Sequence, residues 1–427
     1  MEPIIIENVL LNENRTNILI ENSKITGIGT QIPMPVNAIR IDGRGKAAFP
    51  AFANMHTHAA MTLLKGMGSD MPLQQWLNES IWPAEKHLDG EAVYWGVKLA
   101  CLEMIKSGTT LFNDMYFHLP HAAKAVAEMG IRGVLGLNVF GDGDELTDES
   151  FRQLRGEVEG AGELLKLSIA PHSVYTVSEK GLLHCAEMSR RHGTIFQIHM
   201  SETEHEVQEC LSNHQFRPYA LLEHLGVLGL TEGRFVGAHS LYLDAEEIDL
   251  MARHHITVTH NPASNLKLGS GYRFLYTEMR NAGVNVALGT DGSASSNNLD
   301  MIEAARLMSY LQKGVRQDPT VLPATELMQV VSENGFKAAG INAGRIEVGK
   351  VADLILVDLD NLAFVPMHDP LSGLFYAAHG DAVDTVVCNG RIVMRNRHVE
   401  GEEEIRTQAR RHAQLLRVES LEDCLIV

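Results

Sequence analysis

Short apolar runs alternate with longer helical stretches from about residue 52 to about residue 340. The runs end near Met55–His58, Thr110–Asp114, Val134–Asn138, Leu167–His172, Ile195–His199, Phe235–His239, Thr257–His260 and Val286–Asp291. Seven steps cover the 235 residues from His56 to Asp291, or about 34 residues a step, which is the length of a βα unit. Eight such units predict an α/β fold, a (β/α)₈ TIM-like barrel, with a doubly wound open sheet as the alternative.

The two ends of the chain show a different pattern, of short strands separated by turn residues. Ile4–Ile6 and Asn17–Ile20 are examples near the N-terminus, and a second group surrounds the hairpin sequence Asn389-Gly390. Neither end has enough strands for a stable sheet. We therefore expect residues 1–51 and 345–400 to form one small composite β-sandwich, residues 52–344 to form the barrel, and residues 401–427 to form a C-terminal helical tail.

The triplet His56-Thr57-His58 ends the first predicted barrel strand. Side chains at i and i+2 of a strand share a face, so the two imidazoles can bind one metal ion. The C-terminal ends of barrel strands line the active site. The polar residues at these ends are His56, His58, Asp114, Asn138, His172, His199, His239, His260 and Asp291. Buried imidazoles and carboxylates are costly without partners, which favours a metal site over core packing.

We expect His56, His58, His199 and Asp291 to be the metal ligands. Three nitrogens and one carboxylate oxygen suit a single zinc ion, with iron as the alternative, better than magnesium or calcium. Such a metal lowers the pKa of bound water from 15.7 to about 7, which makes water a nucleophile at neutral pH. Asp291 can also accept the proton of that water.

Two further residues are candidates for catalysis. Glu202 follows His199 by three residues and can protonate a substrate nitrogen. Its alternative role is that of a first-turn helix carboxylate that interacts with the helix dipole. His239 can hold the attacking hydroxide or a developing oxyanion, and its alternative role is that of a fourth nitrogen ligand.

Net charge and composition argue against several classes of partner. The formal net charge of −18 disfavours nucleic acid and anionic membranes, which both need a cationic surface. The five cysteines are widely spaced, so we expect no disulfide framework and a reducing cytoplasm. We see neither a signal peptide nor an apolar run of 18 residues, and expect no membrane span.

Long ordered motifs connect these residues with a known family. They include Pro50 to His58, Met71 to Leu77 with Ile81 to Glu85, Ser107 to Thr110, Ala170 to Ser173, Ile198 to Thr203, Ala238-His239, His260 to Leu268, Leu288 to Gly292 and Gly344 to Leu354. With them the chain resembles, over its full length, the metal-dependent amidohydrolase superfamily. The most similar branch contains the 5'-methylthioadenosine/S-adenosylhomocysteine deaminases and the chlorohydrolases.

The resemblance implies a hydrolase with one metal ion that attacks an aromatic amidine carbon. It implies that Glu202 transfers a proton to the ring and that His239 steadies the attacking hydroxide. It further implies that Glu85 contacts the ribose hydroxyls and that His172 contacts the purine. The loop from Trp82 to Glu85 favours a ribose-bearing substrate, and a homo-oligomer is expected from the family.

One position departs from the family pattern. The adenosylhomocysteine deaminases have an arginine after the third strand that binds the substrate carboxylate, and here that position is Asn138. The loop that follows, Gly141 to Leu146, is acidic and repels a carboxylate. We therefore predict weaker use of S-adenosylhomocysteine than of neutral nucleosides.

The sequence thus predicts hydrolytic deamination of 5'-methylthioadenosine, 5'-deoxyadenosine or adenosine, with release of ammonia and the inosine analogue. The first alternative is a deaminase or chlorohydrolase that acts on guanine, a pterin or a triazine, because the same ligands serve all of these reactions. The second alternative is a barrel protein without catalytic activity.

Overall fold

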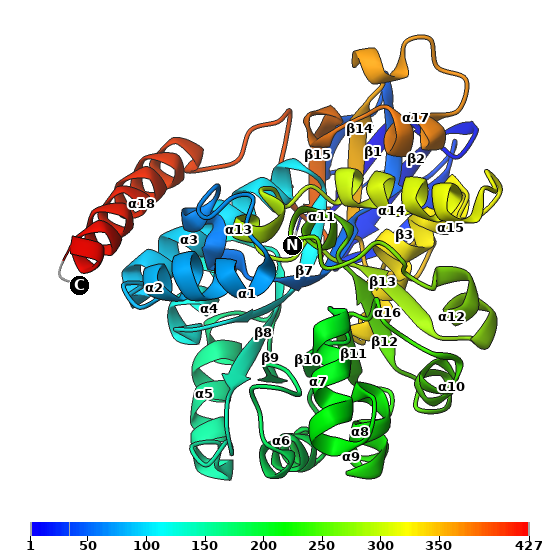
Figure 1. Ribbon diagram of the computed structural model, residues 1–427. Helices are drawn as coiled ribbons and strands as arrows, with labels where there is room; N and C mark the ends of the chain where they lie inside the picture. The colour runs from blue at the N-terminus through cyan, green and yellow to red at the C-terminus, as the bar shows by residue number, and fades with distance from the viewer. Residues whose placement is uncertain (1, 34, 426–427) are drawn as a thin grey trace.

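The computed structural model describes residues 2–33 and 35–425 and contains a barrel of eight parallel strands (Figure 1). The strands lie side by side in the order of the sequence. They are β6 (Phe52–Thr57), β7 (Thr109–Tyr116), β8 (Arg132–Val139), β9 (Leu165–Pro171), β10 (Phe196–Met200), β11 (Phe235–His239), β12 (Thr257–His260) and β13 (Asn285–Leu288). Almost every residue in these strands is buried, as expected for a parallel sheet covered by helices.

Hydrogen bonds bring the last strand of this sheet back to the first. The amide of Asp291, just past β13, donates to the carbonyl of His56 on β6 at 3.0 Å. The side chain of Asn54 exchanges two further hydrogen bonds with Thr290, at 2.7 and 3.0 Å. The sheet therefore curves into the predicted barrel, and the alternative of an open doubly wound sheet is wrong.

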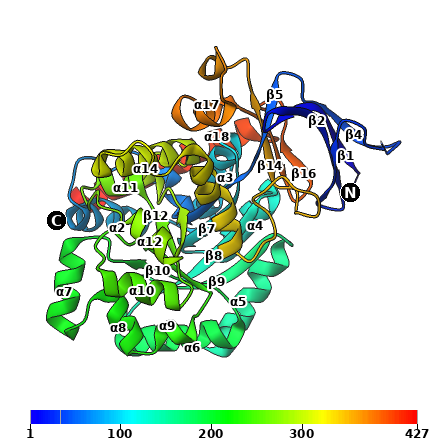
Figure 2. The same cartoon turned by 90° about the vertical axis from the view of Figure 1, so that its right-hand side faces the viewer.

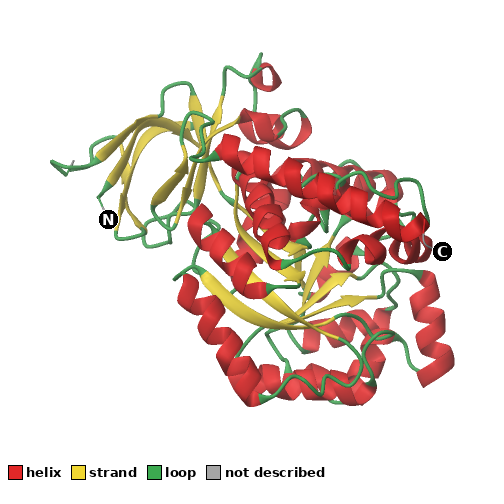
Figure 3. Ribbon diagram, turned by 90° about the vertical axis from the view of Figure 1, so that its left-hand side faces the viewer, coloured by secondary structure: helices red, strands yellow, loops and turns green. Residues whose placement is uncertain are grey.

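Helices surround the barrel and follow the strands in alternation (Figure 3). They are α3 (Gly90–Lys106), α4 (Leu119–Met129), α5 (Asp148–Ala161), α6 (Glu179–His192), α7 (Glu204–His214), α8 (Pro218–His224), α9 (Val227–Leu230), α10 (Ala245–Arg253), α11 (Pro262–Lys267), α12 (Tyr276–Ala282), α13 (Ser293–Ser296), α14 (Met301–Arg316), α15 (Ala324–Met328), the π-helical η3 (Gln329–Glu333) and α16 (Asn334–Ala338). Local sequence explains their ends. At α10, for example, Asp244 accepts from the amide of Glu247, and Glu247 accepts from the amide of Asp244, which is a capping box.

The segment between β6 and α3 is made of short helical pieces. They are the 3₁₀ helix η1 (Ala59–Leu64), α1 (Leu73–Trp76), the π-helical turn η2 (Leu77–Ile81) and α2 (Trp82–Glu85). Pro83 stands at the start of α2, where a missing amide proton is tolerated. These pieces carry Trp82 and Glu85 to the C-terminal end of the barrel.

Both ends of the chain contribute to a second sheet, visible at the upper right of Figure 2. Its strands are β1 (Ile4–Leu11), β2 (Asn14–Glu21), β3 (Lys24–Gly29), β4 (Ile39–Asp42), β5 (Lys46–Pro50), β14 (Leu354–Asp358), β15 (Val383–Cys388) and β16 (Arg391–Met394). The antiparallel pairing of β5 with β14 joins the two ends of the chain. Isoleucines 4, 6, 18 and 20 pack with Leu354 and Leu356 into a separate apolar core. The division of the chain into domains at residues 51, 345 and 401 stays a prediction.

The hairpin predicted at Asn389-Gly390 joins β15 to β16. Its two turn residues have φ angles of 49° and 72°, which a type I′ turn requires. The residues between β14 and β15 were predicted only as part of the sandwich. They form η4 (Leu362–Phe364), α17 (Pro370–Tyr376) and η5 (Gly380–Ala382).

A buried ion pair connects this second sheet with the barrel. Asp353, which precedes β14, is 1% exposed and accepts two hydrogen bonds from the guanidinium of Arg132 on β8, at 3.0 and 3.1 Å. It also accepts from the hydroxyl of Thr110 on β7 and from the amide of Asn389. Both oxygens of this carboxylate are thereby satisfied, which a buried charge requires.

The long helix α18 (Glu402–Leu425) follows the second sheet and packs beside α3 and α2, at the left of Figure 1. Ile405, Ala409 and Leu416 are its buried apolar residues among those whose side chains are described. The predicted helical tail begins at residue 401, and its last two residues lie outside the described part of the chain. Within the described residues, no helix has the length and apolarity that crossing a membrane needs.

Candidate active site

A single cavity at the C-terminal ends of the barrel strands gathers the predicted site residues. Its empty space is about 670 Å³ including the open mouth, a size typical of small-molecule sites. Nine of the ten predicted residues line it, and they are His58, Trp82, Glu85, Asn138, His172, His199, Glu202, His239 and Asp291. The tenth, His56, is buried and lies against the rings of His58 and His199.

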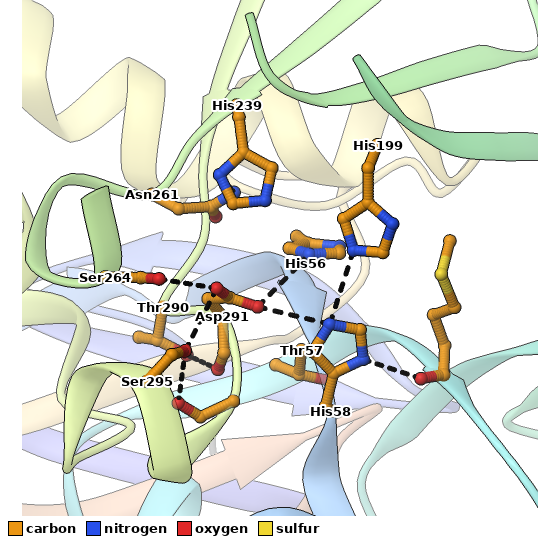
Figure 4. A network of polar contacts seen from close by, with 12 residues as sticks. His56, Thr57, His58, His199, His239, Asn261, Ser264, Thr290, Asp291 and Ser295 are labelled. Atoms are coloured by element: carbon orange, nitrogen blue, oxygen red, sulfur yellow. Dashed lines mark hydrogen bonds and ion pairs between the residues drawn. The ribbon is translucent and has the colours of Figure 1, made fainter. Parts of the chain in front are cut away.

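The rings of His58 and His199 present their Nε2 nitrogens to each other. The Nδ1 of His58 lies 2.7 Å from the carbonyl oxygen of Met115, and the Nδ1 of His199 lies 2.7 Å from that of His172. Because a carbonyl can only accept, both Nδ1 atoms carry a proton, and in the neutral form of each ring the Nε2 atom then has a free lone pair. These two Nε2 atoms are 3.4 Å apart (Figure 4), which is close enough for both to bind one cation.

Asp291 completes this arrangement. Its Oδ1 lies 3.3 Å from Nε2 of His56 and 3.2 Å from Nε2 of His58. Its Oδ2 accepts hydrogen bonds from the hydroxyls of Ser264 and Ser295, at 2.6 and 3.0 Å (Figure 4). The two serines thus hold the carboxylate so that Oδ1 points at the imidazoles.

This donor set fits a divalent metal ion. Nitrogens of His56, His58 and His199 lie within 4.8 Å of one another, and two of these rings donate their other N–H to a backbone carbonyl, as metal-bound histidines do. Burial raises the pKa of Asp291, but the imidazoles of His56 and His58 outweigh it and hold the pKa well below its ordinary value. Burial lowers the pKa of His58, but the hydrogen bond and charge of Asp291 outweigh it and raise that pKa to about 9. A bound metal ion would replace the Nε2 proton of His58, and the site would then combine three imidazole nitrogens with one ionised carboxylate.

Glu202 is a buried neutral acid beside this cluster. The residue is 6% exposed, and burial together with the charge of Asp291 raises its pKa to about 8. The hydroxyl of Ser270 donates to Oε1 at 3.0 Å, so the proton of the acid belongs on Oε2. The alternative of a first-turn helix carboxylate does not apply, because Glu202 precedes Thr203, the N-cap of α7.

His239 faces the same space with a different tautomer. The amide nitrogen of Asn265 donates to its Nδ1 at 2.9 Å, and that of Asn261 lies 3.4 Å away. The Nδ1 is therefore an acceptor and Nε2 carries the proton, 3.7 Å from Oε2 of Glu202. Although a nitrogen of this ring lies within 4.8 Å of donor atoms of His56 and Asp291, an Nε2–H favours a hydrogen-bond donor over a fourth ligand.

The other predicted residues form the outer part of the cavity. Glu85 accepts a hydrogen bond from the hydroxyl of Tyr116 at 2.7 Å. His172 stacks on Phe140 with ring centroids 5.1 Å apart, and burial lowers its pKa to about 3, so its ring is neutral. Asn138 lies beside them, and its Oδ1 is buried without a hydrogen-bond partner among the described residues.

Two polar strand ends do not join the site. Asp114 lies behind the cavity wall, where it accepts from the hydroxyl of Thr57 at 2.8 Å and from the amide of Ala59 at 2.7 Å. His260 stacks on Phe274 with ring centroids 4.0 Å apart. Asp114 therefore supports the His-x-His turn, and His260 has a packing role.

Sequence reasoning missed the residues that orient the predicted ones. Asn261, Ser264 and Asn265 belong to the motif that begins at His260, so closer attention to that motif could have found them. Ser270 and Tyr116 had no recognisable pattern, because their roles depend on contacts with Glu202 and Glu85 that are 68 and 31 residues away in the chain.

Comparisons with known proteins agree with this geometry. The model of the amidohydrolase family matches residues 47–393. The 5'-deoxyadenosine deaminase of Methanospirillum hungatei JF-1 is 46% identical over 380 residues, which cover 88% of this chain and 84% of the relative. The 5-methylthioadenosine/S-adenosylhomocysteine deaminase 1 of Archaeoglobus fulgidus is 41% identical over 393 residues, with 91% of each chain covered.

A solved structure extends the similarity to three dimensions. The crystal structure of an adenosine deaminase from Xanthomonas campestris with bound zinc superposes with a TM-score of 0.89 at 30% identity, and covers 97% of this chain and 98% of that one. The family match, the relatives and the superposition all span the barrel together with strands from both chain ends. The chain is a member of the amidohydrolase family.

Proposed function

We propose that this protein is a metal-dependent deaminase of adenosine-type nucleosides, which hydrolyses the exocyclic C–N bond and releases ammonia. The observation that supports it most is the neutral acid of Glu202, held between the histidine cluster and a cavity of nucleoside size. The names of the relatives, 5'-deoxyadenosine deaminase and 5-methylthioadenosine/S-adenosylhomocysteine deaminase, support the same substrate class.

The metal ligands in this proposal are His56, His58, His199 and Asp291. When a divalent ion is bound, it acidifies a water molecule to near neutrality and so supplies the nucleophile. Zinc is our first choice because nitrogen-rich sites suit it and the similar Xanthomonas campestris structure contains it. Iron is the alternative, since it takes the same ligands.

Three side chains move or hold protons. Glu202 delivers the proton on Oε2 to the ring nitrogen beside the amine-bearing carbon, which makes that carbon more electrophilic. Asp291 accepts one proton of the attacking water and passes it to the leaving amine, which departs as ammonia. The second proton of the water returns to Glu202 when the product carbonyl forms, and this regenerates the acid. His239 donates its Nε2–H to the attacking oxygen and holds it in line with the ring.

The outer cavity determines which nucleoside fits. In our proposal Glu85 accepts hydrogen bonds from the ribose hydroxyls, His172 contacts the purine, and Trp82 covers the sugar. The residues that line the cavity include no lysine or arginine. Because a carboxylate would find no cation there, and Asn138 offers only an amide, we expect neutral 5' groups to be preferred over the amino-acid group of S-adenosylhomocysteine.

The same metal chemistry on guanine, a pterin or a triazine is the alternative function. The Glu85 carboxylate favours a sugar, since these three rings have no vicinal hydroxyls for it to bind. A barrel without catalysis is the remote alternative, and a complete set of four ligands with a neutral acid argues against it.

We also propose a cytoplasmic location and a homo-oligomeric state. Cys101, Cys185, Cys210 and Cys388 are buried free thiols, which fits a reducing compartment. The side chain of Cys424 lies outside the described residues. Size-exclusion chromatography with light scattering will measure the oligomeric state.

Ammonia release from a substrate panel tests the proposed function. The metal-loaded protein is given 5'-deoxyadenosine, 5'-methylthioadenosine, adenosine, S-adenosylhomocysteine, guanine, a pterin and a chlorotriazine. We expect fast turnover of the three neutral adenosines and slower turnover of S-adenosylhomocysteine. Turnover of guanine, pterin or triazine with no activity on any adenosine would refute the nucleoside assignment while leaving the metal site intact.

A further inference from the structure

Tyr116, the last residue of β7, directs its hydroxyl at Glu85. Its side chain is 2% exposed, and Oη donates to Oε1 of Glu85 at 2.7 Å. We propose that Tyr116 is a positioning residue that fixes the orientation of the Glu85 carboxylate. In this orientation the second oxygen of Glu85 accepts hydrogen bonds from the ribose hydroxyls, so the enzyme discriminates against sugars that lack these hydroxyls. This inference rests on the proposed function, in which Glu85 binds the sugar.

The two residues belong to parts of the fold with different rigidity. Tyr116 lies on a barrel strand, in register with Leu137 of the neighbouring strand β8. Glu85 ends the four-residue helix α2, which follows a π-helical turn in the segment of short helical pieces between β6 and α3. A functional side chain on such a segment is placed less precisely than one on a strand. The hydrogen bond from Tyr116 therefore ties Glu85 to the barrel.

The hydrogen bond from Tyr116 also gives the two oxygens of the Glu85 carboxylate different roles. Oε1 is used by Tyr116, whereas Oε2 accepts no hydrogen bond from any group that the structure describes, and Glu85 lines the cavity. A carboxylate oxygen can accept from both hydroxyls of a vicinal diol. A sugar without them would leave this oxygen without a hydrogen-bond partner in the complex, which costs binding energy.

The pKa values of Glu85 and Tyr116 are both shifted by their surroundings. Burial raises the pKa of Glu85 above its ordinary value, and the hydrogen bond from Tyr116 reduces the size of that rise. Burial and the charge of Glu85 raise the pKa of Tyr116 well above its ordinary value. The tyrosine therefore keeps its proton and is the donor in this hydrogen bond.

The variant Tyr116→Phe keeps the buried ring and removes only the hydroxyl. We expect kcat/KM for adenosine to fall about tenfold or more, since a hydrogen bond to a charged group is lost. For 2',3'-dideoxyadenosine the change should stay within about twofold, because Glu85 has nothing to bind there. Calorimetric titration with inosine and 2',3'-dideoxyinosine should show the same split in product affinity.

Tyr94→Phe is the matched control. Tyr94 also donates to a carboxylate, Oε2 of Glu128 at 2.6 Å, but on the outside of the barrel between α3 and α4. That variant should behave like the wild type on both nucleosides. An equal loss on adenosine and dideoxyadenosine in Tyr116→Phe would overturn the inference, because a purely structural role affects both substrates alike.

A double-mutant cycle with Glu85→Gln tests whether Tyr116 acts through Glu85. If it does, Tyr116→Phe causes little further loss on adenosine once Glu85 is replaced. Additive losses would refute the positioning role. Inactivity of the wild type on every nucleoside would refute the proposed function and this inference with it, whereas a normal wild type with an unchanged sugar preference in Tyr116→Phe refutes the inference alone.

Discussion

Replacing Glu202 by glutamine removes the proton that the proposed reaction needs and leaves the surroundings in place. Glutamine has the same length as glutamate. Its carbonyl oxygen can still accept the hydrogen bond that the hydroxyl of Ser270 donates to Oε1 of Glu202 at 3.0 Å in the wild type. The amide has no acidic proton to transfer to the ring. The metal ligands are untouched, so the variant isolates proton transfer from metal binding.

The magnitude follows from the pKa of this buried acid. With a pKa of about 8 instead of 4.5, roughly nine-tenths of the molecules hold the proton at pH 7 instead of roughly three in a thousand. Burial and the charge of Asp291 together thus increase the fraction of active acid by a factor of about 300. Since positioned general acids contribute about 10² to 10⁴ in rate, we expect Glu202→Gln to lose at least about 10² in kcat, or roughly 3 kcal/mol.

The pH profile gives a second, independent readout. Glu202 acts as an acid only when protonated, and its raised pKa keeps the proton on below about pH 8. The wild-type kcat should therefore decline as the pH rises through about 8, and this basic limb should be absent from the residual activity of Glu202→Gln. Steady-state ammonia release from pH 5 to pH 10 measures both profiles.

Metal analysis and a control variant make the test decisive. Glu202→Gln should contain as much metal as the wild type by atomic emission. Glu209→Gln, on the half-exposed face of α7, should keep normal kcat. A near-normal kcat in Glu202→Gln with the basic limb intact would refute the assignment of the general acid.

Three further changes test other parts of the molecule. Asn138→Arg should raise kcat/KM for S-adenosylhomocysteine relative to 5'-deoxyadenosine by about tenfold, because a charge-assisted pair contributes roughly 1.5–3 kcal/mol; an unchanged ratio would contradict the cavity argument. His199→Ala should lower the bound metal per chain, whereas His205→Ala, an exposed histidine, should not, as atomic emission will measure. Asp353→Ala leaves Arg132 buried without its partner and should destabilise the protein by about 3–5 kcal/mol in denaturant unfolding, and a loss below about 1 kcal/mol would refute its structural role.

Much of the architecture could be predicted from local pattern. The eight strand ends follow from apolar runs closed by polar residues, because a strand buried on both faces needs a continuous apolar sequence. The capping box at Asp244 and the hairpin at Asn389-Gly390 follow from nearest neighbours alone. The helix α17 has a local start signal in its N-cap Asp369 and in Pro370, which the sequence analysis did not use, and η4 and η5 were found only in the structure.

Some features of the candidate site could likewise be predicted from the sequence, and others were found only in the structure. The sequence by itself determined which residue types stand at the strand ends, and a parallel barrel brings such ends together, so His56, His58, His199 and Asp291 could be grouped without coordinates. Only the tertiary structure decided the tautomers of His199 and His239, since these depend on the carbonyl of His172 and the amide of Asn265.

The same limit applies to charge and selectivity. Groups far apart in the chain determine the pKa of Glu202 and the hydrogen bond that Ser270 donates to one of its oxygens. The same is true of the hydrogen bond from Tyr116 to Glu85. Desolvation and hydrogen bonding act through space over a few ångströms, whereas a sequence pattern reports only neighbours along the chain. The sequence therefore identified the reacting groups, and the fold decided their protonation and orientation.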